Sequence, residues 1–222
     1  MGSTSEKDDL PPRADLPPAG RSLLRSPWVR WVLLALVLLF ILLFFNPDRF
    51  SSWNARNEWI SAFLDENAPR LDPAERDSLL QALLDAEERH RVDPLLLLAL
   101  IERESHFRPS VRGPRGAVGL MQVQPWVARK MAPKLGIEGF RPESLYDPAG
   151  NVRVGAAYLS FLYEEFEAID LALSAYNKGP TRLRAQLRAG NDRMSRYAKA
   201  ILARREEFAA ERGLRADRAE SD

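Results

Sequence analysis

The chain has 222 residues, with 32 Lys and Arg against 31 Asp and Glu, two His and no Cys. The net charge of +1 lacks the basic excess of nucleic-acid-binding domains, so we expect no nucleic-acid partner. The absence of Cys excludes disulfides, thiolate zinc sites, a cysteine nucleophile and a lipid-anchor cysteine, and two His argue against a multi-histidine metal site. We therefore expect no metal and no other cofactor.

The N-terminal part of the chain is a polar tail followed by a long apolar run. Segment 1–27 holds five of the sixteen Pro and few large apolar residues, which predicts a disordered cytoplasmic tail. From Trp31 to Phe45 no residue is polar. With its flanks the run covers 28–46, close to the ~20 residues that a transmembrane helix needs. Arg residues gather on its N-terminal side, which predicts a single-pass anchor with the N-terminus in the cytoplasm.

Two other interpretations of the apolar run are weaker. A cleaved signal peptide has an apolar core of similar length, but thirty residues precede this run and no small-x-small cleavage site follows it. A helix buried in a protein core is the second alternative. Fifteen apolar residues without a polar face suit such a core poorly, so the membrane anchor is favoured.

The rest of the chain shows helical periodicity and no alternating strand pattern of any length. We expect 47–69 to form a stalk or a first packing helix. Residues 70–212 are expected to form one compact, mainly α domain, and 213–222 a frayed tail.

Asp-Pro pairs mark three of the helix starts, because Asp is a good N-cap and Pro suits the first turn. They occur at Asp72, Asp93 and Asp147. The helix 94–105 is apolar nearly all round and should be the most buried of the domain. Glycines close to one another predict a loop from Pro109 to Gly119. The predicted helices are 73 to about 91, 94–105, 119–132, 148–166, 170–178, one capped by Thr181, and about 194–212.

The buried helix ends with two carboxyl groups, those of Glu102 and Glu104. Apolar surroundings raise the pKa of a glutamate, which then holds a proton near neutral pH and can act as a general acid. The alternative is that both are solvated side chains at a helix end, and composition alone favours this alternative. Two residues apart on a helix, they point in nearly opposite directions and cannot act as a pair.

A glycosidase with two carboxylates would need its second acid from another part of the chain. Between Ser105 and Ile137 the sequence contains neither Asp nor Glu. The sequence leaves open four later acids as candidates, namely Glu138, Glu143, Asp147 and Asp170.

Three blocks resemble the soluble lytic transglycosylases, which share the goose-type lysozyme fold. The catalytic stretch of that family is similar to residues 102–125, ERESHFRPSVRGPRGAVGLMQVQP. Two later family blocks are similar to residues 147–166, DPAGNVRVGAAYLSFLYEEF, and 174–180, SAYNKGP. Together the resemblance covers about residues 90 to 190, and it implies a lysozyme-like helical domain with a glycine-rich active-site loop.

The resemblance also implies roles for single residues. Glu104 aligns with the catalytic glutamate of the family and would be the sole acid and base, whereas Glu102 falls outside the motif. Ser105 would either face the active site or bond the helix backbone. The residues that the resemblance places in substrate binding are Ser105, Gln122, Gln124, Tyr176 and Asn177. The sequence departs from the family where Gly113 replaces the usual Ser, Val127 a Thr and Lys178 a small residue.

The resemblance implies an enzyme that cleaves peptidoglycan between N-acetylmuramic acid and N-acetylglucosamine without water, leaving 1,6-anhydro ends. The apolar run predicts that this enzyme is anchored in a membrane. Its substrate would be glycan strands in the periplasm, and residues 28–46 would lie in the bacterial inner membrane. Cell-wall or secretion-complex proteins are further candidate partners. The acid-free stretch after Ser105 agrees with a mechanism that needs one carboxyl group. Two alternatives remain, a lysozyme-like hydrolase and a weakly active peptidoglycan-binding scaffold.

Overall fold

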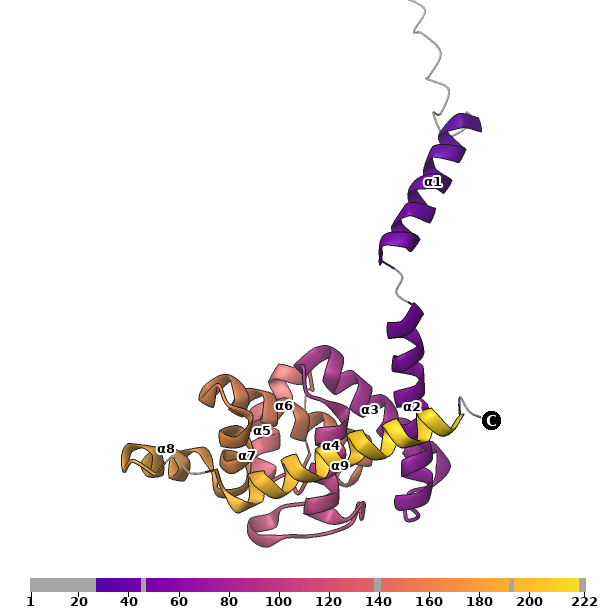
Figure 1. The fold of residues 1–222 in the computed structure, drawn as a ribbon. Coiled ribbons are helices and arrows are strands. Elements are labelled where there is room, and N and C mark those ends of the chain that lie inside the picture. The colour runs from indigo at the N-terminus through magenta and orange to yellow at the C-terminus, as the bar shows by residue number, and fades with distance from the viewer. Residues whose placement is uncertain (1–26, 45–46, 138–140, 192–193, 220–222) are drawn as a thin grey trace, which may run out of the picture. The chain divides into compact units, whose positions relative to one another are not determined.

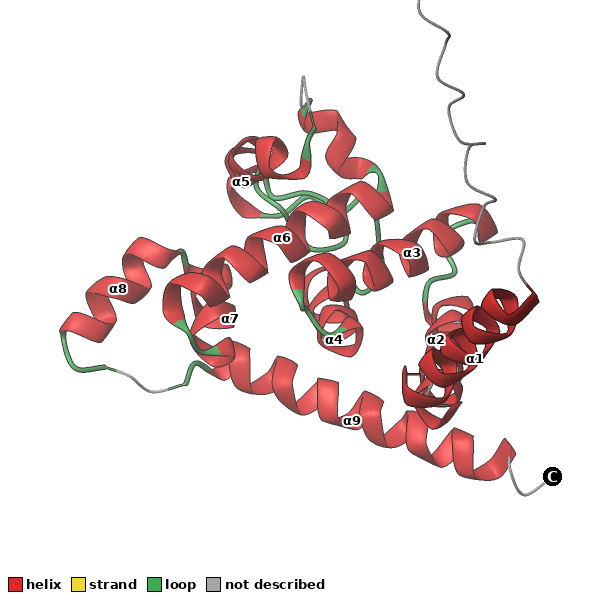
Figure 2. Cartoon of the chain, turned by 90° about the horizontal axis from the view of Figure 1, so that it is seen from above, coloured by secondary structure: helices red, strands yellow, loops and turns green. Residues whose placement is uncertain are grey.

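The computed structural model describes residues 27–44, 47–137, 141–191 and 194–219. The chain divides into two compact units, Met1–Phe50 and Ser51–Asp222. Helices dominate the described residues of both units, and these residues contain no strand beyond isolated bridges such as Val118 with Val123 (Figure 2). The mainly α prediction is confirmed.

The first unit contains the apolar helix α1, Pro27–Phe44. Within the described residues, no helix is both long and apolar enough to cross a membrane. The anchor predicted at 28–46 is therefore not confirmed, and residues 45–46 lie outside the described part. The predicted tail, apart from its last residue, also lies outside it.

The second unit is built from helices α2 to α9, whose chain order can be followed in Figure 1. The α-helices are α2 (Pro47–Asn67, which begins before the division), α3 (Pro73–His90), α4 (Pro94–Ser105), α5 (Pro125–Met131), α6 (Pro148–Phe166), α7 (Ile169–Lys178), α8 (Pro180–Arg188) and α9 (Arg196–Ala219). Three short 3-10 helices lie in the connections: η2 (Pro114–Gly116), η3 (Ala132–Leu135) and η4 (Pro142–Tyr146).

The three predicted Asp N-caps are confirmed. The Asp72 carboxylate accepts from the backbone N–H of Glu75, whose own carboxylate accepts from the Asp72 N–H, so α3 begins with a capping box. Asp93 caps α4, and Asp147 caps α6 through the N–H of Gly150. These caps satisfy backbone donors that a helix leaves without partners at its first turn.

Three predicted helix boundaries are wrong. The helix expected from Gly119 begins only at Pro125, because Gly119 has φ 80° and Gln122 has φ 49°, values that a right-handed helix excludes. Helix α8 begins at Pro180 without a side-chain cap, so Thr181 does not cap it. Helix α9 continues past Arg212 to Ala219, through most of the segment expected to fray.

Helix α4 is buried along its whole apolar stretch from Pro94 to Ile101, as its sequence predicts. It packs along α9 and against α3. Helix α3 in turn packs on α6, which also contacts α7. The acidic end of α4 is therefore surrounded by elements from distant parts of the sequence.

Aromatic side chains fix α9 against the first long helix of the unit. Phe208 of α9 is fully buried, and its ring centroid lies 4.9 Å from that of Phe63 and 5.8 Å from that of Trp59, both on α2. Phe63 also packs edge-on against Phe107, just after α4, at 5.7 Å. This cluster holds α2, α4 and α9 in one arrangement.

Candidate active site

Glu104 lies at the end of α4, half-buried beside the first turn of α9. The Tyr197 hydroxyl of α9 donates a hydrogen bond to Glu104 Oε1. Burial raises the pKa of the Glu104 carboxyl, and the Tyr197 bond and the charge of Arg103 only partly oppose this effect. A carboxyl group with a raised pKa can hold a proton and deliver it, which is what a general acid requires.

Two tyrosines lie near this carboxyl group, and Tyr197 is the one that donates a hydrogen bond to it. Burial, followed by the charge of Glu104, raises the pKa of both Tyr197 and Tyr176 well above the usual range, so both keep their protons at neutral pH. The Tyr176 hydroxyl donates to the backbone oxygen of Met121 at 2.9 Å. Tyr176 therefore connects α7 to the glycine-rich loop, and its hydroxyl lies close enough to Glu104 to feel the charge of that carboxyl group.

Sequence reasoning missed Tyr197. It lies 93 residues after Glu104 in the chain, outside the blocks that carry the resemblance. The available signal was an aromatic residue in the first turn of the last predicted helix. The contact between Tyr197 and Glu104 depends on how α9 packs along α4, and local sequence patterns do not predict such packing.

A buried amide from α6 holds the glycine-rich loop. The Asn151 side chain is fully buried, and its Oδ1 accepts from the Met121 N–H at 2.8 Å. Its Nδ2 donates to the backbone oxygens of Val118 at 2.9 Å and Leu145 at 2.8 Å. A Cβ at Gly119 would lie 2.3 Å from this nitrogen, and Gly119 also has a positive φ, so the loop requires glycine there.

Gln122 turns its amide back onto the loop. Its Nε2 donates to the backbone oxygens of Val111 at 3.1 Å and Gly119 at 3.0 Å. A Cβ at Gly113 would lie only 2.1 Å from Gln122 Oε1. The glycine that replaces the usual serine at position 113 thus leaves the space that the Gln122 amide occupies.

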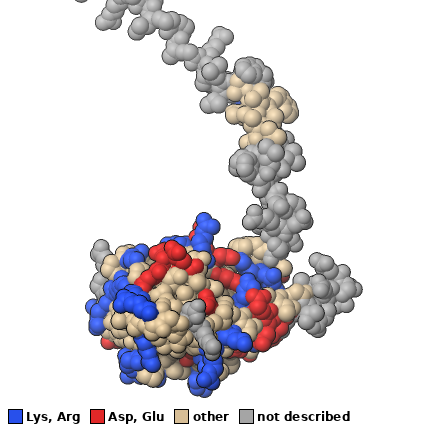
Figure 3. Space-filling model, turned by 60° about the vertical axis from the view of Figure 1, so that its left-hand side comes forward, with Lys and Arg blue, Asp and Glu red and all other residues tan. Residues whose placement is uncertain are grey.

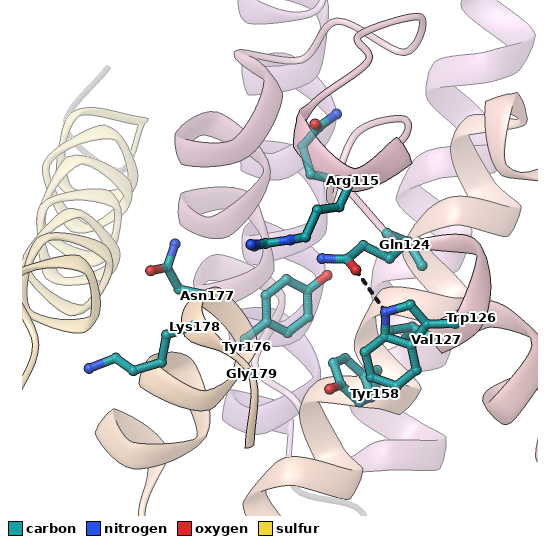
Figure 4. A pocket seen from close by; sticks show the side chains of 11 residues that line it. Arg115, Gln124, Trp126, Val127, Tyr158, Tyr176, Asn177, Lys178 and Gly179 are labelled. Carbon is teal, nitrogen blue, oxygen red and sulfur yellow. Dashed lines mark hydrogen bonds between the residues drawn. The ribbon is translucent and has the colours of Figure 1, made fainter. Parts of the chain in front are cut away.

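Beside this loop is a cavity of about 140 Å³ (Figure 4). Its lining brings together four of the predicted substrate-binding residues, Gln122, Gln124, Tyr176 and Asn177, and does not include Glu104. Trp126 Nε1 donates to Gln124 Oε1 at 2.7 Å. The other lining residues are Arg115, Val123, Trp126, Val127, Tyr158, Lys178 and Gly179.

The structure places Ser105 away from this cavity. Ser105 is fully buried, and its hydroxyl donates to the backbone oxygen of Ile101 at 3.1 Å. Of the two alternatives for Ser105, the structure therefore shows the bond to the helix backbone. Glu102 instead contacts a later turn of the same helix α9, where Arg204 donates to it at 2.7 Å. Of the two acids that end the helix, only Glu104 lies among the tyrosines.

Comparisons with known proteins identify the family. The family model described as Transglycosylase SLT domain matches residues 81–198, more than half of the chain. The soluble lytic murein transglycosylase of Escherichia coli K12 is 38% identical over 92 residues, which are 40% of this chain and 14% of the relative. The membrane-bound lytic murein transglycosylase C of Haemophilus influenzae strain Rd is 33% identical over 110 residues, 45% of this chain and 31% of the relative.

Solved structures show the same similarity. The 70 kDa soluble lytic transglycosylase of Escherichia coli matches with a TM-score of 0.52 and 27% identity, over 58% of this chain and 23% of that one. An inactive mutant of the lytic transglycosylase Slt from Pseudomonas aeruginosa matches with a TM-score of 0.54 and 27% identity, over 67% and 25%. The chain spans less than a third of the length of each of these relatives. It belongs to the transglycosylase SLT domain family.

Proposed function

We propose that this chain is a murein lytic transglycosylase that cleaves the bond between N-acetylmuramic acid and N-acetylglucosamine in peptidoglycan. The observation that carries the proposal is the half-buried Glu104, whose pKa is raised by burial and whose carboxyl group accepts a bond from Tyr197. The relatives named above are lytic murein transglycosylases. The Pseudomonas structure is that of an inactive mutant in which a glutamate is replaced by glutamine.

In this mechanism Glu104 acts first as an acid and then as a base. It donates its proton to the glycosidic oxygen, and the bond from this oxygen to the anomeric carbon of N-acetylmuramic acid breaks. The resulting carboxylate takes the proton of the 6-hydroxyl of the same sugar, whose oxygen bonds to the anomeric carbon. The product is a 1,6-anhydro ring, and Glu104 regains its proton. The Tyr197 hydroxyl stabilises the carboxylate between the two steps.

The surroundings of Glu104 favour a single acid. Its hydrogen-bond partner among the described residues is a tyrosine, whereas a retaining glycosidase places a second carboxylate ~5 Å away. Glu102 is paired with Arg204, and Asp147 caps α6. Of the other acids that the sequence left open, Glu138 lies outside the described residues.

The cavity residues divide into two roles in this proposal. Gln124, Tyr176 and Asn177 line the cavity and contact the sugars. Gln122 holds the loop in shape, since both hydrogens of its amide go to backbone oxygens. Ser105 supports the helix end through its backbone bond and does not touch the substrate.

Analysis of the products tests the reaction type. The full chain is incubated with purified peptidoglycan sacculi, and the released fragments are analysed by mass spectrometry. We expect fragments that end in 1,6-anhydro-N-acetylmuramic acid. Fragments heavier by one water, with reducing ends, would instead identify the hydrolase alternative. Binding to sacculi without release of any fragment would identify the scaffold alternative.

The substrate places this activity in the cell envelope, and the Haemophilus relative is named as membrane-bound. Attachment through residues 28–46 to the inner membrane, with the domain in the periplasm, stays a prediction from the sequence. Fractionation of cells that produce the full chain or a chain lacking residues 1–46 tests it. Recovery of both forms in the same soluble fraction would contradict it.

A further inference from the structure

A chain of hydrogen bonds connects the start of α9 to α7. Ser195 directly precedes α9, and its hydroxyl accepts from the backbone N–H of Ala198 at 3.1 Å, as an N-cap residue does. The Ser195 hydroxyl oxygen also lies 2.7 Å from that of Ser174 on α7. The Ser174 hydroxyl donates to the backbone oxygen of Asp170, again at 2.7 Å. The first turn of α9 is therefore bonded to the backbone of α7 through two serine side chains.

The direction of each bond in this chain can be assigned. A hydroxyl group has one hydrogen, and Ser174 gives its hydrogen to Asp170 because a backbone oxygen can only accept. Ser195 is therefore the donor between the two serines. Each hydroxyl donates one bond and accepts one, from the Ala198 N–H to the Asp170 oxygen. Hydrogen bonds in such a chain polarise and strengthen one another.

Ser174 is an unusual residue for its place in the fold. Among the described residues, the buried polar side chains are those of Ser105, Asn151 and Ser174. On the same helix, Ala172 and Ala175 are fully buried and contribute apolar packing. Apolar burial has no direction, whereas a hydrogen bond requires one alignment of donor and acceptor. The serine thus specifies where α9 lies along α7, which an alanine could not do.

Each serine is close in sequence to a tyrosine of the candidate site. Tyr176 follows Ser174 by two residues, and Tyr197 follows Ser195 by two residues. Helices α7 and α9 pack against each other, and Figure 2 shows α7 beside the start of α9. The aromatic contacts of α9 through Phe208 lie eleven residues beyond Tyr197, which is ~16 Å along a helix. The serine pair is therefore much nearer to Tyr197 than the aromatic contacts are.

We propose that Ser174 and Ser195 are positioning residues, whose bond holds the first turn of α9 on α7 so that the Tyr197 hydroxyl reaches Glu104. The proposal rests on the proposed function, in which this hydroxyl stabilises the carboxylate between the two steps. Both serines lie outside the described lining of the cavity beside the loop, so they act through Tyr197. A misplacement of about 1 Å at a catalytic contact can lower a rate about 10²-fold, so a bond far from the sugar can matter to the reaction.

The pKa of Glu104 reports whether Tyr197 is in place. The groups that act on this carboxyl group come from three helices, Arg103 on α4, Tyr197 on α9 and Tyr176 on α7. On the face shown in Figure 3, Lys and Arg alternate with Asp and Glu, and neither sign covers it alone. The wider surface on that face therefore adds no strong field of one sign. Burial raises the pKa of Glu104 and the Tyr197 bond opposes this effect, so loss of the bond raises the pKa further.

The first test is Ser174→Ala, which removes the link to α7 and leaves the N-cap serine in place. With the full chain and soluble glycan strands, we expect kcat to fall about tenfold and KM to change little. The high-pH limb of the pH–rate profile should move to higher pH, because the Glu104 carboxyl group loses its donor. Ser160→Ala is the matched control, since the Ser160 hydroxyl on α6 donates to the backbone oxygen of His90 at 3.3 Å. This control should leave the rate and the profile unchanged.

A second substitution separates positioning from general packing. In a chain that already carries Tyr197→Phe, Ser174→Ala should lower kcat by less than about twofold, because the hydroxyl that it positions is gone. Ser195→Ala breaks the same chain of bonds from the α9 side and should lower kcat at least as much as Ser174→Ala does. Ser195→Thr keeps a hydroxyl and should retain the wild-type pH profile. Circular dichroism checks the fold of each variant, and either alanine variant alone suffices for the test.

Equal losses of kcat with and without the Tyr197 hydroxyl would overturn the proposal, as would a slower variant whose high-pH limb has not moved. Absence of anhydro fragments with the wild-type chain would instead overturn the proposed function. The pKa of Glu104 is therefore also measured without substrate, by NMR of isotope-labelled glutamate carboxyl carbons, with the signal assigned through Glu104→Gln. A higher Glu104 pKa in Ser174→Ala would support the positioning of Tyr197 in either case, and an unchanged one would overturn it.

Discussion

The two acids that end α4 have opposite surroundings although they are two residues apart. Glu102 is about one-third exposed and pairs with Arg204, which also binds Glu207 and Glu211 on its own helix. Glu104 has a tyrosine as its hydrogen-bond donor in place of an arginine, and burial raises its pKa. Glu102 is thus held in an ion pair, whereas the neutral donor and the half-buried site of Glu104 let that carboxyl group hold a proton. Under the proposed function, the hydrogen-bond partner, more than the residue type, would separate a structural acid from a catalytic one.

The sharpest test of this comparison exchanges each acid for its amide. We expect Glu104→Gln to lower the rate of fragment release from sacculi by about 10³-fold or more, because glutamine cannot transfer the proton. Glu102→Gln is the matched control and should retain the wild-type rate within about twofold, since its role is an ion pair. Similar losses in the two variants would remove the distinction. Circular dichroism of both variants checks that the fold is intact.

The neutral donor can be removed separately. Tyr197→Phe should lower kcat about 10- to 100-fold, because the carboxylate loses a bond that stabilises it. The same bond lowers the pKa of Glu104, so its loss should move the high-pH limb of the pH–rate profile to higher pH. A purely structural role for Tyr197 would change the rate without moving this limb. Tyr163→Phe, at an exposed position on α6, serves as the control.

The burial of Glu104 also predicts how stability depends on pH. A carboxyl group whose pKa is raised in the folded state makes the folded protein less stable as pH rises from the unfolded pKa through the folded one. Glu104→Gln removes this loss. We expect its Tm to equal that of the wild type near pH 4 and to exceed it at pH 8, by thermal melts at both values. Glu88→Gln, at an exposed carboxyl group on α3, controls for the change of charge; a matching pH trend in that variant would refute the burial argument.

The smallest effect is expected on the Glu102 side. Arg204 and Glu102 are both about one-third exposed, and such pairs contribute ~1 kcal/mol or less. Arg204 also lies over the Phe208 ring, 4.1 Å from its centroid. Arg204→Lys should therefore lower the free energy of unfolding only slightly in urea titrations, with a smaller effect still at high salt. A loss of several kcal/mol would contradict this prediction, because it would show that the Arg204–Glu102 ion pair contributes far more to the free energy of unfolding than an exposed pair does.

The sequence predicts the secondary-structure elements better than the tertiary contacts between them. The Asp-Pro starts at Asp72, Asp93 and Asp147 are confirmed because capping depends on neighbouring residues alone. The predicted helix 119–132 is a loop before Pro125, because the backbone there is held by hydrogen bonds to Asn151, about thirty residues away. Tyr197 was missed for the same reason, since its partner is set by helix packing. Glu104 could be selected only through the resemblance, because composition favoured a solvated side chain.

The distance in sequence between Glu104 and Tyr197 has a consequence for the newly made chain. Glu104 is synthesised long before α9, the helix that carries its hydrogen-bond donor and that packs through Phe208 against Trp59 and Phe63. A chain that stops before residue 196 would keep the acid and lose the hydroxyl that stabilises its carboxylate. Under the proposed function, the acid and its hydrogen-bond donor would therefore come together only after α9 has been synthesised and has packed.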